Sequence, residues 1–512
     1  MADHTFRANL NSAQIPTNPL TFGRSIVIRD RDQNYSPNLA SKTDKDKDAG
    51  IPQVIYGANI LPTEFGYKSV GYYGSKEKCP GTPYFAFPIR SITESATLIH
   101  TETGYLYRLK HTADGPEVPE FTYVATAAGT MTYAHVAGTT YIYVARVGCY
   151  IYNFTTNLLE PVTLGGLDAS QILGITATGG YLLAWSEDAI AWSSLVDPTD
   201  FVPSLDTGAG GGSVEGAKGA ITVCVANSYG IYIFTSSNCV SAQLSNNARY
   251  PFNFKEIVGS AGLDSVQSVS YEGNQNSAYA FTSAGFQQIS HNGAKTIWTD
   301  LYEQGLNSVH VDENTTFGEF VGSDGKITDA KLVTVNSRYV CISIKHRTEN
   351  YYTQIWIYDI SLDRWGRLEK DHYEVFEDEY HNIALITSDG RYLTVDSPFA
   401  TYPYSVEEDV GSLLLGRYQF SRARLTVFQS VDLENLYPQD LYDAWGNQYG
   451  EDIYPTVYLL GSLDGKTGSF EECSRYGFRY HKLRTAVNHS LLLKGHFDLN
   501  SVVLTVSQGG GR

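Results

Sequence analysis

Two short acidic segments are the strongest candidates for chemistry in this sequence. Asp197 and Asp200 flank a proline-containing turn, and Glu377, Asp378 and Glu379 follow one another directly. Glycoside hydrolysis needs two carboxyl groups at a fixed separation around the scissile bond, and either segment could supply such a pair. Both segments are turn-like, however, and Asp before Pro commonly initiates a turn. We therefore predict that these acids shape turns, that the chain has no catalytic residues and that it is not an enzyme.

A calcium-loop pattern is present only in part. Asp44, Asp46 and Asp48 alternate as in such a loop, but Gly50 falls one place late and Ile55 stands where the closing glutamate would be. This pattern is typical of a solvated loop. We predict no cofactor and no metal site, although the sequence does not decide whether a bound metal stabilises a loop.

The histidines and cysteines also lack the spacing of metal ligands. His100, His291 and His372 lie near expected turns or strand ends, where ordinary polar roles are common. No CxxC pair occurs, which argues against a zinc ribbon or a dense disulfide framework. We predict buried, reduced thiols at Cys79, Cys149, Cys224, Cys239, Cys341 and Cys473.

Two glycine-containing segments match the sequence patterns of functional loops only in part. Residues 462–467 (SLDGKT) resemble the Asp-box turn of sialidases, but the segment is one residue short and occurs once, so a hairpin turn is expected. Residues 208–213 (GAGGGS) lack the Lys-Ser/Thr that completes a phosphate-binding loop, and we predict a flexible loop there.

The elements that would hold these residues are strands. Of the 512 residues 42% are hydrophobic and 13% aromatic, with 38 Tyr and 47 Gly against only 2 Met. Flat rings suit pleated surfaces and glycine suits tight turns, so the composition favours an all-β fold with a large core. The start of the chain lacks the apolar core of a signal peptide, and no window approaches a membrane span, so we predict folding in a cytoplasm and no membrane insertion.

The chain is strongly acidic. It carries 37 Lys and Arg against 55 Asp and Glu, a formal net charge of −18. Tight electrostatic binding to nucleic acid or anionic lipid is therefore disfavoured over most of the surface. An acidic channel wall would still let a DNA duplex pass without sticking, because it repels phosphates.

Apolar hairpins recur from about residue 94 to 397. Their turns repeat at about 40 to 50 residues, the period of four-stranded propeller blades, with one longer step between His291 and Asp329 that indicates an insertion. Residues 152–162 and 358–368 also align without a gap, each as Tyr, Asn or Asp, an apolar residue and Thr or Ser. Such a pattern predicts a side-chain-capped turn that returns to the sheet at Leu159 or Trp365.

These patterns predict a β-propeller of six or seven blades over residues 91–410, with a β-sandwich array as the alternative. Residues 1–90 contain Pro16, Pro19, Pro37, Pro52 and Pro62 between short extended pieces, which indicates an extended N-terminal strap. Residues 411–512 change pattern again and predict a C-terminal β platform or sandwich.

Several segments resemble one protein family. Residues 172–185 (ILGITATGGYLLAW) and 190–204 resemble a segment common in the tail proteins of short-tailed bacteriophages, and residues 231–238, 247–254 and 354–368 continue the likeness in the same order. The family is the phage tail nozzle, also called tail tubular protein B or packaged-DNA stabilisation protein. The likeness covers roughly residues 170 to 370 and is loose elsewhere.

This resemblance implies a homo-oligomer, a hexameric ring in the virion tail that is assembled in the host cytoplasm. Such a ring closes the DNA channel below the portal and adaptor, retains the genome, conducts double-stranded DNA at ejection without sequence-specific binding, and docks fibres or spikes. The residues that line the channel stay unknown.

Two other functions remain open from the residues alone. A propeller-type tail protein that binds or depolymerises polysaccharide would need carboxylates from different blades. A cellular scaffold propeller would be expected to repeat the WD dipeptide, which this sequence lacks.

Overall fold

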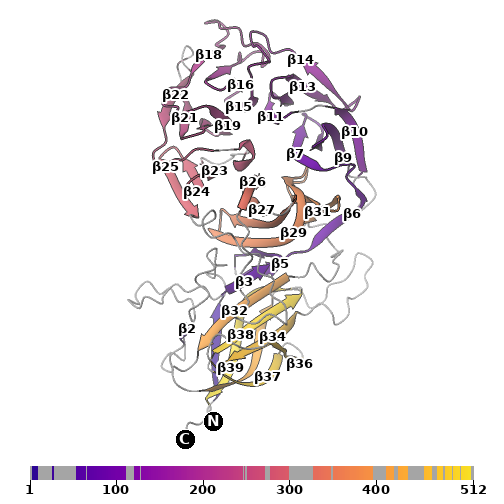
Figure 1. The fold of residues 1–512 in the computed structure, drawn as a ribbon, viewed down its shortest axis with the longest axis vertical. Coiled ribbons are helices and arrows are strands. Elements are labelled where there is room, and N and C mark those ends of the chain that lie inside the picture. The colour runs from indigo at the N-terminus through magenta and orange to yellow at the C-terminus, as the bar shows by residue number, and fades with distance from the viewer. Residues whose placement is uncertain are drawn as a thin grey trace.

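Antiparallel hairpins follow one another along the chain and close into a ring of small sheets, with a second β unit at its edge (Figure 1). The structure is a computed structural model, and it describes residues 3–9, 26–27, 54–64, 66–110, 120–126, 129–245, 247, 251–263, 265–270, 277–298, 327–346, 350–395, 411–419, 425–435, 455–463, 470–476, 479–486, 488–495 and 497–508. In this part of the chain no helix is long and apolar enough to cross a membrane.

Four blades are regular four-stranded antiparallel sheets whose strands pair in chain order. Each blade places its first strand at the centre of the ring and its fourth at the rim (Figure 1). Their strands are β7 (Pro83–Arg90), β8 (Ser95–Thr101), β9 (Tyr105–Lys110) and β10 (Glu120–Thr126) in blade 1; β11 (Met131–Val136), β12 (Thr139–Val144), β13 (Gly148–Asn153) and β14 (Leu158–Val162) in blade 2; β15 (Gly174–Thr178), β16 (Tyr181–Trp185), β17 (Ala189–Trp192) and β18 (Gly210–Ser213) in blade 3; and β19 (Ile221–Asn227), β20 (Gly230–Thr235), β21 (Cys239–Leu244) and β22 (Phe252–Glu256) in blade 4.

Blade 5 has a very short innermost segment. Its sheet consists of β23 (Ser277–Thr282), β24 (Gly285–Ser290) and β25 (Gly293–Trp298). Val269, just after a 3-10 turn (η2, Val266–Ser268), forms an isolated antiparallel bridge with Ala280 of β23. The Ser268 hydroxyl donates to the Ala330 carbonyl of the next blade at 3.2 Å, so this segment takes the place of the inner strand.

Blades 6 and 7 share one long strand. Blade 6 is formed by β26 (Ile327–Val335), β27 (Tyr339–His346), β28 (Tyr352–Asp359) and the first half of β29 (Arg364–Glu377). The second half of β29 is the inner strand of blade 7, which continues through β30 (Ile383–Thr387) and β31 (Arg391–Val395). The fourth strand is β6 (Tyr72–Lys78), from the N-terminal part of the chain. Strand β29 packs on β7 of blade 1, which closes a ring of seven blades.

The predicted all-β propeller is therefore confirmed. It has seven blades, which is one of the two numbers predicted. The predicted boundary at residue 91 differs from the structure, because β6 and β7 already belong to the propeller. The insertion expected between His291 and Asp329 falls largely on residues 299–326, which lie outside the described residues.

The two aligned sequence segments form the same turn, between the third and fourth strands of blades 2 and 6. The side chain of Asn153 accepts hydrogen bonds from the amides of Thr155 and Thr156, and that of Asp359 accepts from Ser361 and Leu362. The next strands begin so that Leu159 pairs with Tyr152 and Trp365 with Tyr358. The capped turn is thus confirmed in both copies.

We expect Asp359→Ala to lower the free energy of unfolding by about 2 to 3 kcal/mol and Asn153→Ala by about 1 kcal/mol. Both changes remove a turn cap, but Asp359 is fully buried and its carboxylate also accepts from the Arg338 guanidinium at 2.9 Å. Urea denaturation of the two variants measures the difference. Equal losses would contradict the role given to the Arg338 contact.

The second unit is a sandwich of two sheets. One sheet contains β32 (Gly411–Gln419), β38 (Asn488–Gly495), β34 (Thr456–Ser462) and β35 (Phe470–Glu472); the other contains β39 (Asp498–Gln508), β33 (Thr426–Asn435), β37 (Arg479–Ala486) and β36 (Ser474–Tyr476). Leu413, Leu491 and Val457 from the first sheet pack with Phe428 and Leu504 from the second. The predicted C-terminal sandwich is therefore present.

The predicted N-terminal strap adds strands to this sandwich. Strand β1 (Asp3–Asn9) pairs with β39 along seven residues, while β2 (Ile26–Val27) and β3 (Val54–Ala58) pair with β32. Strands β4 (Ile60–Pro62) and β5 (Tyr67–Ser69) then connect β29 of the propeller to β39 of the sandwich. The N-terminal and C-terminal strands thus form one unit, and the residues between them form the propeller.

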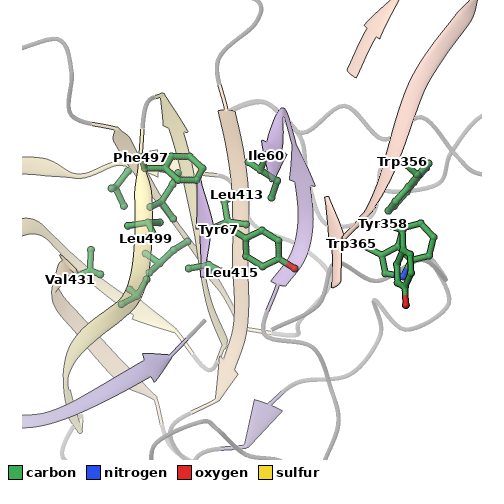
Figure 2. Packing of buried hydrophobic residues seen from close by; sticks show 14 of the residues in the cluster. Ile60, Tyr67, Trp356, Tyr358, Trp365, Leu413, Leu415, Val431, Phe497 and Leu499 are labelled. Atoms are coloured by element: carbon green, nitrogen blue, oxygen red, sulfur yellow. The ribbon is translucent and has the colours of Figure 1, made fainter. Parts of the chain in front are cut away.

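One hydrophobic cluster joins the two units. Figure 2 shows Ile60 and Tyr67 between the sandwich residues Leu413 and Leu415 and the aromatic side chains of blade 6. Polar contacts support the junction, because the Arg364 guanidinium donates to the Thr63 carbonyl at 2.7 Å and lies 4.5 Å from the centre of the Tyr67 ring. The propeller and the sandwich thus share one hydrophobic core.

Candidate functional site

The inner strands of blades 1, 2, 6 and 7 enclose a small cavity near the propeller centre. Its volume is about 30 Å³, and it is lined by residues that include Phe85, Tyr133, Gln267, Lys331, Glu374 and Glu377. Ligand pockets usually measure about 300 to 1,000 Å³, whereas this one has room for one or two water molecules. A sugar ring does not fit in it.

A buried ion pair dominates this cavity. Lys331 of β26 contacts the carboxylate of Glu374 on β29, and both side chains are at most 5% exposed. The Lys331 ammonium also donates to the Tyr84 carbonyl at 3.0 Å, and Glu374 accepts from the Ala86 amide at 3.2 Å. Burial raises the pKa of Glu374 to about 7, although Lys331 opposes this shift. The pair ties blades 6, 7 and 1 together where the ring closes.

His372 lies fully buried beside this pair. Its Nδ1 is 2.7 Å from the Lys370 carbonyl and its Nε2 is 2.8 Å from the Ser343 hydroxyl, while its ring stacks on Tyr352. Burial lowers the pKa of His372 to about 4, so the imidazole is neutral at physiological pH. It therefore has the ordinary polar role that the sequence predicts, but it lies buried within β29 and not near a turn or strand end.

The acidic segment at residues 377–379 forms the turn between β29 and β30. Glu377 accepts from the Asn336 amide at 3.1 Å and contacts the His381 ring at 2.5 Å. Asp378 accepts from the amides of Tyr380 and Asn382, which is the geometry of a side-chain-capped turn. Burial, and secondarily the charge of Asp378, raises the pKa of Glu379 to about 7.

The other acidic segment shapes a turn in blade 3. Asp197 accepts from the Thr199 amide at 2.8 Å and from its hydroxyl at 2.7 Å, and these bonds lower the pKa of Asp197. Asp200 accepts from the Val202 amide at 3.0 Å. This segment lies in blade 3 and residues 377–379 lie in blade 7, so the structure does not bring the two acidic segments together. The two carboxylates that line the cavity, those of Glu374 and Glu377, come from the same strand, β29.

The remaining predicted positions have structural roles or lie outside the described residues. His100 is buried edge-on to Tyr84, and His291 contacts Gln243 at 3.0 Å. All six cysteines are free and buried, as predicted. Among the described residues, no group of three His, Cys, Asp or Glu side chains could hold a metal. The calcium-like segment 44–50 and most of residues 462–467 fall outside the described residues.

The prediction of a flexible loop at residues 208–213 is wrong for four of its six residues. Residues 210–213 form β18, which pairs with β17 along four residues. A Cβ on Gly211 would lie 2.9 Å from the Ile190 carbonyl oxygen, so glycine permits a close approach of the two strands. The sequence signal was the glycine run itself, which fits an edge strand as well as a linker.

The Lys331–Glu374 pair was not predicted from the sequence. Its partners are 43 residues apart, on the inner strands of different blades. The available signal was a lysine within the mainly apolar run Ala330 to Val335, since a cation is rarely placed in a buried strand without a partner.

Comparisons with known proteins give a distant structural neighbour. No protein-family model matches the chain, and no curated protein matches it. Among solved structures, a similar chain is described as the crystal structure of the WD40 beta propeller domain of Doa1. It shares 9% sequence identity, with a TM-score of 0.42, over 64% of this chain and 97% of that chain.

Proposed function

We propose that this protein is a structural component of a phage tail, a nozzle subunit that assembles as a hexameric ring and forms the lower wall of the DNA channel. The observation that carries the proposal is the hydrophobic cluster that fixes the propeller to the sandwich. A wall that holds back packaged DNA must transmit force without bending, and a continuous core between its parts supplies that stiffness.

Two further features support this function. The family resemblance covers residues 170–370, which correspond to blades 3 to 6. The candidate carboxylates cap turns or join in ion pairs, and the central cavity is too small for a sugar. These roles suit a scaffold that conducts DNA and docks an adaptor, fibres or spikes.

Imaging tests the assembly directly. We expect negative-stain images of the protein mixed with the portal and adaptor of its phage to show a six-fold ring attached below them. A protein that stays monomeric and never joins a tail would overturn the nozzle proposal. Cleavage of host surface polysaccharide that is lost in Asp197→Asn or Glu377→Gln would instead establish the depolymerase alternative.

We expect the assembled ring to bind duplex DNA weakly at physiological salt. The chain carries a net charge of −18, so few phosphates can be neutralised by Lys and Arg and few counterions released. Fluorescence anisotropy of a labelled duplex in 50 mM and 200 mM salt measures both affinity and salt dependence. Tight binding that falls steeply with salt would contradict an acidic conduit.

A further inference from the structure

One loop of blade 3 exposes a group of aliphatic side chains. Residues 193–209 connect β17 to β18, and we call them the blade 3 loop. Val196 is 90% exposed and Leu205 is 74% exposed, and Leu195 and Val202 are also exposed. Aliphatic side chains that gather on a surface commonly mark a place where another protein binds.

Internal contacts hold the blade 3 loop in shape. Phe201, in its middle, is 2% exposed and packs in the core between blades 2 and 3. On one side of this anchor the Ser194 amide donates to the Asp200 carbonyl at 2.7 Å. On the other side the Ser204 amide donates to the Ala209 carbonyl at 3.1 Å. The exposed side chains thus lie on an ordered support, which lowers the entropy lost when a partner binds.

The blade 3 loop is acidic, and the chain does not neutralise its charge. The loop contains Asp197, Asp200 and Asp206 but no Lys, Arg or His. Within the part of the chain that the structure describes, no ion pair involves these aspartates. Its sequence neighbours are acidic too, since between Arg146 and Lys218 the chain has eight Asp and Glu and no cation. A partner that carries Lys or Arg would be attracted here, whereas an acidic partner would be repelled.

A second copy of this chain does not supply a matching surface. The whole chain has a net charge of −18, and two blade 3 loops would repel each other. The cations of β37 are already engaged, because Arg479 pairs with Asp432. Lys482 and Arg484 both contact the carboxylate of Glu471. The chemistry of the loop therefore favours a different, basic protein.

The blade 3 loop also lies away from the junction of the two units. Strand β18, which follows it, is at the end of the propeller farthest from the sandwich (Figure 1). The hydrophobic cluster that joins the units contains residues of blades 5 and 6 and none of blade 3 among the described residues. A partner bound to the loop would therefore leave the junction undisturbed.

We propose that the blade 3 loop docks a basic segment of another tail protein, with aliphatic side chains of that segment against Val196 and Leu205 and its Lys or Arg side chains facing the loop aspartates. This inference rests on the docking role proposed above, and it names the surface and the chemistry of the partner. Apolar contact with opposite charges around it combines burial with electrostatic steering.

Two synthetic peptides of equal length test the chemistry of this surface. One is an amphipathic peptide of Leu and Lys, and the other has Glu in place of each Lys. Fluorescence anisotropy measures the binding of each peptide to the full chain. The Leu/Lys peptide should bind at least about tenfold more tightly, and its affinity should fall as salt is raised. Equal binding of the two peptides would overturn the proposal, because charge would then not select the partner.

Variants of the blade 3 loop show where the peptide binds. The double variant Val196→Ser with Leu205→Ser should weaken binding of the Leu/Lys peptide by about tenfold or more, because it removes the apolar contacts. Asp206→Asn should weaken it by about threefold at low salt, because it removes one of the attracting charges. Circular dichroism checks that each variant folds.

Matched controls make similar changes elsewhere. Val258→Ser alters a 79% exposed valine after blade 4, and Glu215→Gln removes the charge of an exposed acid that follows β18. Both should bind the Leu/Lys peptide as the wild-type protein does. If the loop variants also bind it as the wild type does, the peptide is held by the general negative charge of the protein, and the docking site is refuted.

Assembly experiments separate this inference from the nozzle proposal. Tails built with the double variant should lack one protein that wild-type tails contain, as mass spectrometry can show, while the ring still forms on the portal and adaptor. A ring that fails to form only in the double variant would mean that a second copy occupies the loop, which refutes this inference and leaves the nozzle proposal standing. Loop-dependent binding of the Leu/Lys peptide by a protein that forms no ring would support the docking site and overturn the nozzle proposal.

Discussion

Replacing Lys331 by Met should lower the free energy of unfolding by about 3 to 5 kcal/mol at pH 8, because the buried Glu374 then either keeps its charge without a partner or must bind a proton that the unfolded chain does not hold at this pH. Urea denaturation monitored by tryptophan fluorescence measures this loss. The exposed pair of Lys218 and Glu256 provides a matched control, and Lys218→Met should cost far less than Lys331→Met because water screens this pair.

The cost of Lys331→Met should also depend on pH. Burial raises the pKa of Glu374 above the ordinary value of 4.5, so near pH 5 the folded protein holds a proton that the unfolded chain has partly released. A protonated Glu374 needs no cation, and the loss should therefore be smaller at pH 5 than at pH 8. In the double variant Lys331→Met with Glu374→Leu, most of the stability should return.

Two results would contradict this account of the ring closure. If Lys331→Met lowers the free energy of unfolding no more than Lys218→Met does, the folded protein neutralises Glu374 without Lys331 at little cost. A loss that is the same at pH 5 and pH 8 would mean that Lys331 contributes by packing, for example through its contact with the Phe85 ring, and not by its charge.

Local features of this fold could be predicted from the sequence because their causes are local. The turns capped by Asn153 and Asp359 depend on a side chain and the amides two and three residues later, so one aligned pattern identified both. Burial of the cysteines follows from the apolar strands around them. The acids at 197–200 and 377–379 could be assigned to turns for the same reason.

Features that depend on ring closure could not be predicted in this way. Blade 7 takes β6 from about 300 residues before its other strands, and no periodic pattern specifies which strand fills that place. Likewise, the side-chain pattern of β1 does not specify β39 as the strand with which it pairs. The Lys331–Glu374 pair exists only because blades 6 and 7 are neighbours, and that adjacency is a property of the whole ring.

Removing the Trp365 ring at the junction should destabilise both units. Trp365 is 8% exposed, and its ring centre lies 5.0 Å from that of Tyr358 and 5.7 Å from that of Phe286. We expect Trp365→Ala to lower the free energy of unfolding by about 3 to 5 kcal/mol, through lost burial and the cavity that remains. Trp192→Ala, in the outer part of blade 3, is the matched control and should cost less because that ring is only half-buried.

The regions that lose stability in Trp365→Ala test the junction more directly than the size of the loss does. Trp365 belongs to the cluster that also contains Leu413 and Leu491 of the sandwich, so its loss should loosen a core that both units share. Hydrogen exchange should therefore become faster in β38 and β33 of the sandwich as well as in β28 of blade 6, and should stay unchanged in β12 of blade 2. Faster exchange confined to blade 6 would show that the two units are held together only by the chain connections between them. A nozzle wall built from such subunits would bend at that junction, so this outcome would also remove the main support for the proposed function.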